Sequence, residues 1–379
     1  MPALCLSLHA DYLCRRSGPC CTSGWPIHVE SDRLAEWRDA LRSGRLSFTA
    51  DGVRDGLPFV TSSDLPPGAS AVLRTRASGT CIFYREDDGL CAVHRDLGHS
   101  SLPSACRHFP RRALIEPGRV SVSLTHYCPA VARLAFRTDF VPAVVPAPAT
   151  LVGHLGLEGL DARDALPPLL RPGLLADHET YHAWEDLAVG ILGLDVTPEL
   201  ALARISAFTE ELRTWKPADG SLRERFESLL AARAGASGAG SESPLRPLDA
   251  CREAHGLVLA SAPGGVGASA APDDFDAPDA ALVEPTWRMI SRPLRQFLAA
   301  HAFGNWCAYN GRGLRTVVRS LDVALKVVRV EAARACAQAG RALDEALLAE
   351  AFSAADLLLV HLADPTALAA RLSAVEARE

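Results

Sequence analysis

Cysteine placement constrains this 379-residue chain more than any other feature, because seven of its eleven cysteines fall between residues 14 and 128. Such a cluster has three physical interpretations: a disulfide scaffold, a metal or iron–sulfur site, or small side chains buried in a core. The seven are Cys14, Cys20, Cys21, Cys81, Cys91, Cys106 and Cys128.

A disulfide scaffold is the least favoured of the three. A chain of this length can form two or three domains with their own cores, so it does not need covalent staples. The N-terminus lacks the basic start and long apolar run of a signal peptide, which predicts a cytoplasmic protein, and structural disulfides are rare in that compartment. The cysteine count is odd, and a bond between the neighbours Cys20 and Cys21 would be strained.

Metal or cluster binding is therefore the favoured interpretation. Thiolate sulfur is a soft ligand that suits zinc and iron–sulfur clusters, and four sulfurs complete either site. The spacing does not pair two Cys-x-x-Cys knuckles, so zinc and an iron–sulfur cluster both stay open. Side chains of adjacent residues diverge, so we expect Cys20 and Cys21 to serve different sites, or one to ligate while the other packs.

Residues beside these cysteines are further candidates. His94 follows Cys91 at knuckle spacing, which makes it either a nitrogen ligand or a surface residue at the end of a turn. Arg107 and Arg111 flank the Cys106 segment, where guanidinium groups could stabilise an anionic cluster through charge-assisted hydrogen bonds or form a solvated basic turn. The remaining four thiols are expected to be buried core residues: Cys5, Cys251, Cys307 and Cys336.

The apolar periodicity predicts a mainly α fold: a small, irregular α+β, cysteine-rich N-terminal module followed by an α-helical bundle. We expect the module over residues 1–140, with a short strand at 27–30, a helix from Ser31 to about Gly44, and a β-hairpin that brings Cys81 and Cys91 together. A proline-rich linker at 141–150 precedes a helical region at 151–234. A flexible linker at 235–285 precedes the C-terminal helical region at 286–379.

Charge and hydropathy exclude two classes of partner. The chain has 39 basic and 45 acidic residues, a formal net charge of −6, and no basic field that would recruit nucleic acid. No stretch approaches the roughly 18 continuous apolar residues of a membrane span, so no membrane contact is expected.

Three other motifs are weaker candidates for a functional site. His178, His182 and Glu185 share one helix face, which could bind a metal or simply be solvated. His301 is expected to be a satisfied core histidine. The glycines at 264, 265 and 267 follow an apolar run but do not lead into a helical pattern, so we interpret them as a linker and not as a nucleotide-binding turn.

The order of the cysteines resembles a known family. The segments Cys20-Cys21-Thr-Ser-Gly-Trp-Pro-Ile27, Cys81-Ile-Phe-Tyr84 and Gly89-Leu-Cys91 are similar to the YkgJ-type cysteine-cluster family, whose members are described as zinc- or iron-chelating modules. The family usually has a further cysteine where this chain has Arg15 to Pro19. The continuation resembles the flagellin lysine N-methylase branch through Asp96-Leu-Gly98, Cys106-Arg-His-Phe-Pro-Arg111 and Cys128-Pro129.

This resemblance covers about residues 12–136 and implies a function. A lysine N-methylase would use S-adenosylmethionine as methyl donor and a protein such as flagellin as substrate. It would combine a cysteine-rich N-terminal half with a helical C-terminal half. The sequence identifies no catalytic base, and it agrees equally with a second class of protein, a non-catalytic metal- or cluster-binding scaffold.

Overall fold

The computed structural model describes residues 1–15, 18–48, 56–61, 65, 68–152, 159–234, 245–262 and 275–374. These residues form two compact units. The larger unit contains Met1–Tyr12 and Arg112–Glu379, and the smaller unit is Leu13–Arg111. Helices predominate and the strands are short, which confirms the mainly α fold class with a smaller α+β part.

The boundary of the cysteine-rich unit differs from the sequence expectation of residues 1–140. The N-terminal strand β1 (Ala3–Leu6) belongs to the larger unit, because it pairs in parallel with β6 (Arg119–Leu124) and antiparallel with β7 (Val144–Pro146). The segment expected to be a proline-rich linker at 141–150 thus supplies an edge strand, a position that tolerates proline.

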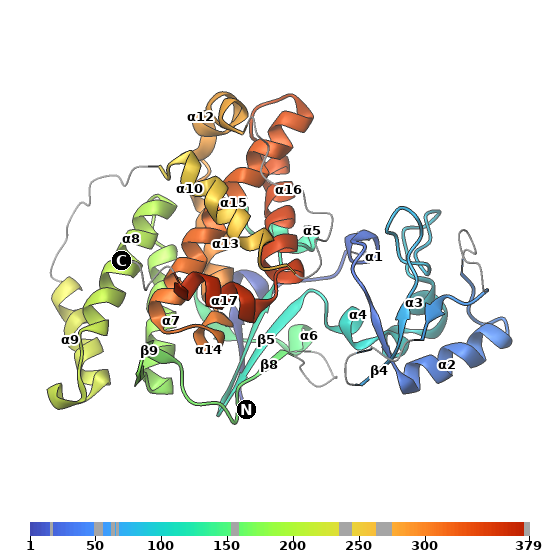
Figure 1. The fold of residues 1–379 in the computed structure, drawn as a ribbon, viewed down its shortest axis with the longest axis horizontal. Coiled ribbons are helices and arrows are strands. Elements are labelled where there is room, and N and C mark those ends of the chain that lie inside the picture. The colour runs from blue at the N-terminus through green and yellow to red at the C-terminus, as the bar shows by residue number, and fades with distance from the viewer. Residues whose placement is uncertain are drawn as a thin grey trace. The chain divides into compact units, whose positions relative to one another are not determined.

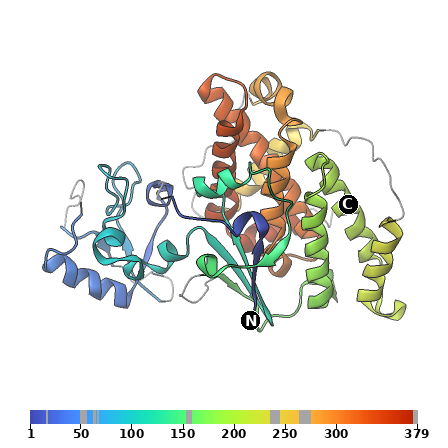
Figure 2. The same ribbon diagram turned by 180° about the vertical axis from the view of Figure 1, so that it is seen from behind.

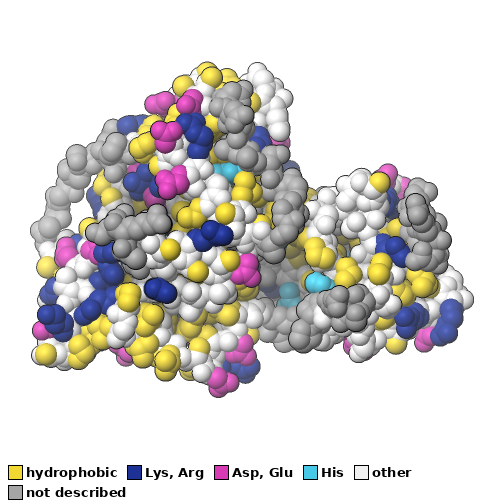
Figure 3. All heavy atoms as spheres, viewed as in Figure 1, with side chains coloured by type: hydrophobic (Ala, Val, Ile, Leu, Met, Phe, Trp, Pro, Cys, Tyr) yellow, Lys and Arg dark blue, Asp and Glu magenta, His cyan; other side chains and the backbone are white. Residues whose placement is uncertain are grey.

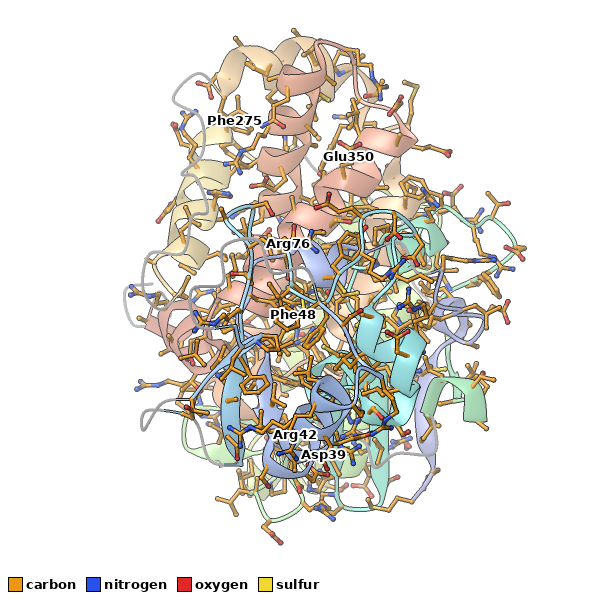
Figure 4. All side chains as sticks on the ribbon, turned by 90° about the vertical axis from the view of Figure 1, so that its right-hand side faces the viewer. Asp39, Arg42, Phe48, Arg76, Phe275 and Glu350 are labelled. Carbon is orange, nitrogen blue, oxygen red and sulfur yellow. The ribbon has the colours of Figure 1, made fainter. Side chains whose placement is uncertain are left out.

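The smaller unit is built on a three-stranded sheet of order β2-β4-β3, with β2 at His28–Glu30, β4 at Ala69–Leu73 and β3 at Phe59–Val60. Helix α2 (Ser31–Arg42) follows β2 directly, so the predicted strand and helix are both confirmed. Figure 4 labels Asp39 and Arg42, which form an exposed ion pair one turn apart on α2. Three short helices complete the unit: α1 (Pro19–Thr22), α3 (Ala92–Leu97) and α4 (Ser104–His108).

Aromatic side chains form the core of the smaller unit. The rings of Trp37 and Phe83 meet edge to face at a centroid distance of 5.3 Å, and the Trp37 indole N–H donates to the Ser101 carbonyl at 2.9 Å. Phe48, labelled in Figure 4, meets Phe83 edge to face as well, at a centroid distance of 6.2 Å. This core fixes the segment that carries Cys81, since Phe83 lies two residues beyond it.

The larger unit contains a mixed five-stranded sheet of order β7-β1-β6-β5-β8, with β5 at Arg111–Glu116 and β8 at Gly159–Asp161. A two-residue turn at Pro117-Gly118 joins β5 to β6 as a hairpin, and Gly118 takes the positive φ of 81° that such a turn needs. All six residues of β6 are buried, as expected of a strand inside a sheet. Two further strands, β9 (Leu169–Arg171) and β10 (Leu174–Leu175), pair with each other.

Helices pack beside this sheet, and α15 (Leu314–Ala339) lies among them in contact with α8, α10, α13 and α16 (Figures 1 and 2). The helix lies in the C-terminal helical region expected at 286–379, and its apolar residues at helical spacing, such as Leu314, Val317 and Leu321, are buried. The helices are α5 (Pro129–Leu134), α6 (Ala149–Val152), α7 (His178–Leu192), α8 (Pro198–Arg213), α9 (Leu222–Ala234), α10 (Leu248–Leu259), α11 (Asp276–Pro278), α12 (Glu284–Trp287), α13 (Ser291–Ala302), α14 (Cys307–Asn310), α15, α16 (Glu345–Asp356) and α17 (Pro365–Ala374).

Helix α10 lies inside the segment that the sequence assigned to a flexible linker at 235–285. It is a core helix: Cys251 and His255 are buried, and the His255 ring lies 2.8 Å from the Glu331 carboxylate of α15. Because its short apolar pattern is flanked by glycine-rich residues, the sequence analysis assigned this helix to the linker. The glycine-rich segments at 235–244 and 263–274, including the glycines at 264, 265 and 267, lie outside the described residues.

On the face drawn in Figure 3, side chains of both charge signs are interspersed over the larger unit. Within the described part of the chain, no single helix combines the length and apolarity needed to cross a membrane. One pair of consecutive segments, Glu345–Leu362 and Pro365–Ala374, reaches that composition jointly but bends by 98° at its break.

A buried ion pair inside the larger unit provides a stability prediction. The Arg329 guanidinium donates two hydrogen bonds to the Asp279 carboxylate, at 2.8 and 2.6 Å, and both side chains are almost fully buried. Asp279→Ala would leave that guanidinium buried without its counter-ion, so we expect the free energy of unfolding to fall by about 3–5 kcal/mol. Urea unfolding followed by circular dichroism measures the change.

The matched control for this prediction is Glu227→Ala, which removes an exposed partner of Arg223 on α9. Exposed pairs one helical turn apart contribute about 0.3–0.5 kcal/mol, so this variant should stay close to the parent chain. Equal losses in the two variants would contradict a special role for the buried pair.

Candidate metal centre

Helix α1 carries the adjacent cysteines Cys20 and Cys21. It begins after Gly18, whose φ of 90° lies in the left-handed region. A side chain at this position would also meet the Tyr84 hydroxyl, since a Cβ placed there lies 2.9 Å from that oxygen. Glycine is therefore required both for the turn that starts α1 and for the close approach of Tyr84.

The segment from Cys81 to Cys91 is tied to α1 by backbone contacts. The Cys81 N–H donates to the Cys21 carbonyl at 2.6 Å, and Tyr84 forms an isolated antiparallel bridge with Cys91. The predicted hairpin is thus present only as a bridged turn, because Cys91 starts helix α3 instead of a second strand. The expected proximity of Cys81 and Cys91 comes from this turn.

Two cysteine sulfurs lie in contact, and a third cysteine interacts with one of them. Cys20 Sγ and Cys21 Sγ are 3.9 Å apart, and the Cys21 thiol also shares a hydrogen bond with Cys91. The side chains of these adjacent residues diverge by about 100° around the helix, but both line the same cavity. The expectation that the two cysteines serve different sites, or that one ligates while the other packs, stays a prediction.

That cavity has a volume of about 300 Å³ and lies wholly within the smaller unit. Its wall contains exposed Cys14 together with half-buried Cys20, Cys21 and Cys91. The other lining residues are Gly18, Gly89, Leu90, His94 and Arg95. His94, one of the sequence candidates, is therefore placed beside the thiols.

Of the two arginines expected beside a cluster, neither is part of this wall. Arg107 donates to the Ser100 carbonyl and Arg111 donates to the Arg107 carbonyl, each at 3.4 Å. Burial, and then the charges of Arg111 and Arg107, lower the pKa of His99. The arginine at the cavity is Arg95, which the sequence analysis did not single out and which its position one turn after Cys91 could have indicated.

Cys81 and Cys106 lie deeper in the same unit. Burial raises the pKa of the Cys81 thiol to about 12 and raises that of Cys106 well above its ordinary value. For both thiols, negative charge on Cys91 and Cys20 raises the pKa further. These electrostatic interactions place five cysteines around one region of the smaller unit.

The pKa values of the thiols of Cys20, Cys21 and Cys91 shift in different directions. Hydrogen bonding among these thiols raises the pKa of Cys21 and lowers that of Cys20. The hydrogen bond with Cys21 lowers the pKa of Cys91 to about 7, against the opposing effect of burial. Thiolates on neighbouring sulfurs repel one another, which disfavours ionisation of all three together.

This donor set fits a thiophilic metal or cluster. A cation can replace the thiol protons and neutralise several thiolates, whereas like charges on neighbouring sulfurs repel. Tetrahedral zinc needs all four sulfurs about 3.8 Å apart, given Zn–S bonds of about 2.3 Å. In the described residues, two groups have three ligand atoms within 4.8 Å of one another, and neither contains a cysteine.

The sulfurs are therefore spread more widely than a single zinc ion requires. A four-iron cluster attaches its cysteines to four separate iron atoms and so accommodates a wider spacing in a larger cavity. Cys20, Cys21 and Cys91 would hold such a cluster, with Cys81, Cys106 or the exposed Cys14 as the fourth ligand.

The seventh predicted ligand, Cys128, lies in the larger unit at the start of α5. It is buried, and its sulfur lies 3.8 Å from the Tyr12 hydroxyl. The four cysteines expected to be core thiols are all buried, which confirms that expectation, and burial raises their pKa: Cys5, Cys251, Cys307 and Cys336. All eleven cysteines lie within the described residues, and all are free thiols.

The two groups with closely spaced ligand atoms both belong to the larger unit. One joins His126, His301 and Asp356, where Asp356 accepts from His301 Nε2 at 2.7 Å and from the Thr125 hydroxyl at 3.1 Å. The expectation that His301 is a satisfied core histidine is confirmed. The other joins His178 and His182 to Glu116 of β5, and not to Glu185, which the helical spacing had suggested.

The pKa of Cys91 gives a prediction for the reduced, metal-free chain. With a pKa of about 7, Cys91 is about half thiolate at pH 7, so its alkylation by iodoacetamide should rise with pH and level off above about pH 8. Peptide mass spectrometry between pH 6 and 9 measures the rate. Cys336, buried and with a raised pKa, is the unreactive control.

In Cys21→Ala the donor to Cys91 is lost, and the midpoint of this alkylation profile should move to higher pH. A profile that keeps its midpoint in Cys21→Ala would contradict the shared hydrogen bond.

Comparison with protein-family models, with curated proteins and with solved structures gives no match for this chain. Its function is therefore inferred from its own residues: the thiols of the smaller unit, and the histidine and carboxylate groups of the larger one.

Proposed function

We propose that the smaller unit binds an iron–sulfur cluster through its cysteines, and that the chain is an S-adenosylmethionine-dependent protein lysine N-methyltransferase of the flagellin-methylase type. The observation that carries the first part is that three thiols, Cys20, Cys21 and Cys91, line one cavity of about 300 Å³, with the first two sulfurs 3.9 Å apart. Such a donor set favours a soft cation over any other occupant.

Free thiols at this density also support a location in the cytoplasm. In a reducing compartment the sulfurs of Cys20 and Cys21 stay available as ligands, whereas an oxidising compartment would favour disulfides. An iron–sulfur cluster held there would supply a rigid anchor at the floor of the cavity.

The methylase part rests on the resemblance of residues 12–136 to flagellin lysine N-methylases. In methyl transfer the uncharged lysine amine attacks the methyl carbon, the bond from that carbon to the sulfonium sulfur breaks, and S-adenosylhomocysteine leaves. The amine then gives its extra proton to a base or to water.

The alternative is a non-catalytic scaffold that holds zinc. The distance of 3.9 Å between Cys20 Sγ and Cys21 Sγ favours it, because this value is close to the 3.8 Å or so expected for two sulfurs on one zinc ion. Metal identity therefore separates the two proposals.

Cluster binding is tested by anaerobic purification followed by iron, sulfide and zinc analysis and an absorption spectrum. We expect a coloured protein containing iron and sulfide, with at least a two-fold loss of both in Cys91→Ser and Cys106→Ser. Cys336→Ser, which changes a buried thiol of the larger unit, is the matched control and should keep the full content. A colourless protein with one zinc would favour the scaffold, and equal content in all variants would contradict the ligand assignment.

Donor binding and activity are tested separately. Isothermal titration with S-adenosylmethionine should show one site in the cluster-loaded chain, and flagellin incubated with methyl-labelled donor should gain label on lysine. Cys91→Ser should lose most of both signals, and Cys336→Ser should keep them. A cluster-loaded chain that neither binds the donor nor labels flagellin would retain the metal proposal and reject the methylase.

A further inference from the structure

The larger unit brings two histidines of α7 against a carboxylate of β5. His178 and His182 lie one turn apart at the start of α7, so both project from one side of it. Glu116 is the last residue of β5, and its carboxylate is almost fully buried. The two histidine side chains keep 25% and 19% of their surface exposed, so the group opens to solvent on their side.

From this juxtaposition we propose that Glu116, His178 and His182 form a zinc site distinct from the cysteines. Two histidines and one glutamate form a ligand set of catalytic zinc sites, in which water takes the fourth position. The site would take a divalent zinc ion with a water or hydroxide as its fourth ligand.

The spacing of the ligand atoms agrees with this coordination. Bonds of 2.0–2.1 Å in a tetrahedron place neighbouring donor atoms about 3.4 Å apart. Glu116 Oε2 lies 3.0 Å from His182 Nε2, and Glu116 Oε1 lies 3.8 Å from His178 Nδ1. The two distances bracket the ideal value, so small side-chain rotations would complete the site without a change in the backbone.

Tyr309 of α14 orients the carboxylate. Its hydroxyl donates to Glu116 Oε1 at 2.6 Å and lies 3.5 Å from His178 Nδ1. Ligating carboxylates are commonly held by such a second hydrogen bond, which fixes their direction toward the metal. Tyr309 is a positioning residue in this proposal.

A second observation points to a ligand at the same place. The Tyr181 hydroxyl is buried and has no hydrogen-bond partner in the described part of the chain. It lies within electrostatic reach of Glu185, Glu116 and Tyr309. Buried hydroxyls are nearly always hydrogen-bonded, and a water bound to the metal would supply the partner that this one needs.

The surrounding charges also favour a cation. Glu116, Glu185 and Asp186 contribute carboxyl groups, while Arg119, which is paired with Glu185, is the neighbouring guanidinium. Burial raises the pKa of Glu116, but hydrogen bonds from His182 and Tyr309 outweigh it and hold that pKa below its ordinary value.

The other histidine group of the larger unit is a weaker candidate. Asp356 already accepts from the His126 backbone N–H, the Thr125 hydroxyl and His301, so its oxygens are occupied within the protein. Among the described residues, Glu116 is hydrogen-bonded to two side chains, the proposed ligand His182 and the positioning residue Tyr309.

The test uses the full chain, purified anaerobically and dialysed against a chelator, then titrated with Zn²⁺ and, as a spectroscopic probe, with Co²⁺. We expect the parent chain to bind one more equivalent of Zn²⁺ than His178→Gln or His182→Gln, with iron and sulfide content unchanged. The corresponding Co²⁺ signal should show visible bands without the strong sulfur-to-metal absorption that thiolate ligands give.

Glu179→Gln is the matched control, because this exposed residue lies on α7 between the two histidines and outside the group. This variant should bind the same number of Zn²⁺ equivalents as the parent chain and give the same Co²⁺ spectrum. A 100-fold excess of Zn²⁺ over its dissociation constant should also raise the melting temperature of the larger unit by roughly 5 °C in the parent and in this control, and by less in the histidine variants.

His178→Gln guards against loss of fold as an explanation, because His178 makes only long contacts of 3.5 and 3.8 Å in this group. Equal Zn²⁺ stoichiometry in the parent and in a folded His178→Gln variant would overturn the proposal. So would a Co²⁺ spectrum that the substitution leaves unchanged, since the three side chains would then form only a hydrogen-bond network.

Discussion

Buried carboxylates hold the larger unit together across long stretches of sequence. Asp356 of α16 binds the segment at Thr125 and His126, more than 200 residues earlier, and Glu185 of α7 pairs with Arg119 and accepts from the Gly304 N–H. A buried carboxylate is costly unless it is paired, so each of these contacts requires both partner segments to be in place. The β5–β6 hairpin and the C-terminal helices therefore form one unit, although the cysteine-rich unit is inserted before the hairpin in the chain.

The smaller unit groups thiols around a cavity, whereas the larger unit pairs buried carboxylates. Its cavity wall in the described residues contains thiols, His94 and Arg95 but no carboxylate, and the sulfurs of Cys20 and Cys21 lie 3.9 Å apart. A hydrogen bond between sulfurs is weak, so it contributes little to holding thiols together at this place. Soft cations bind such groups of thiolates, which is why the functional proposal is built on the cysteines and not on the helical unit.

Local patterns predicted the elements that depend on local interactions. The strand before Ser31, helix α2, and the apolar stripe of α15 were all visible in the sequence, because burial of one face leaves a periodic signal. The five-stranded sheet was missed, since β1 pairs with β6 more than 100 residues away and β8 has only three residues. Helix α10 was missed for a related reason: its twelve residues lie between glycine-rich segments.

The candidate sites likewise combine residues that local spacing predicted with residues that only the fold brings together. Helical spacing placed His178 and His182 together, but it offered Glu185 as their partner, whereas the fold turns Glu185 toward Arg119 and supplies Glu116 from a strand. No spacing along the chain could have shown this, because the pairing depends on how β5 lies against α7. The two proposed sites also differ in chemistry. Four thiolates can hold zinc or an iron–sulfur cluster, whereas two imidazoles with a carboxylate suit zinc and not a cluster, so the two sites differ in the occupants that they can accept.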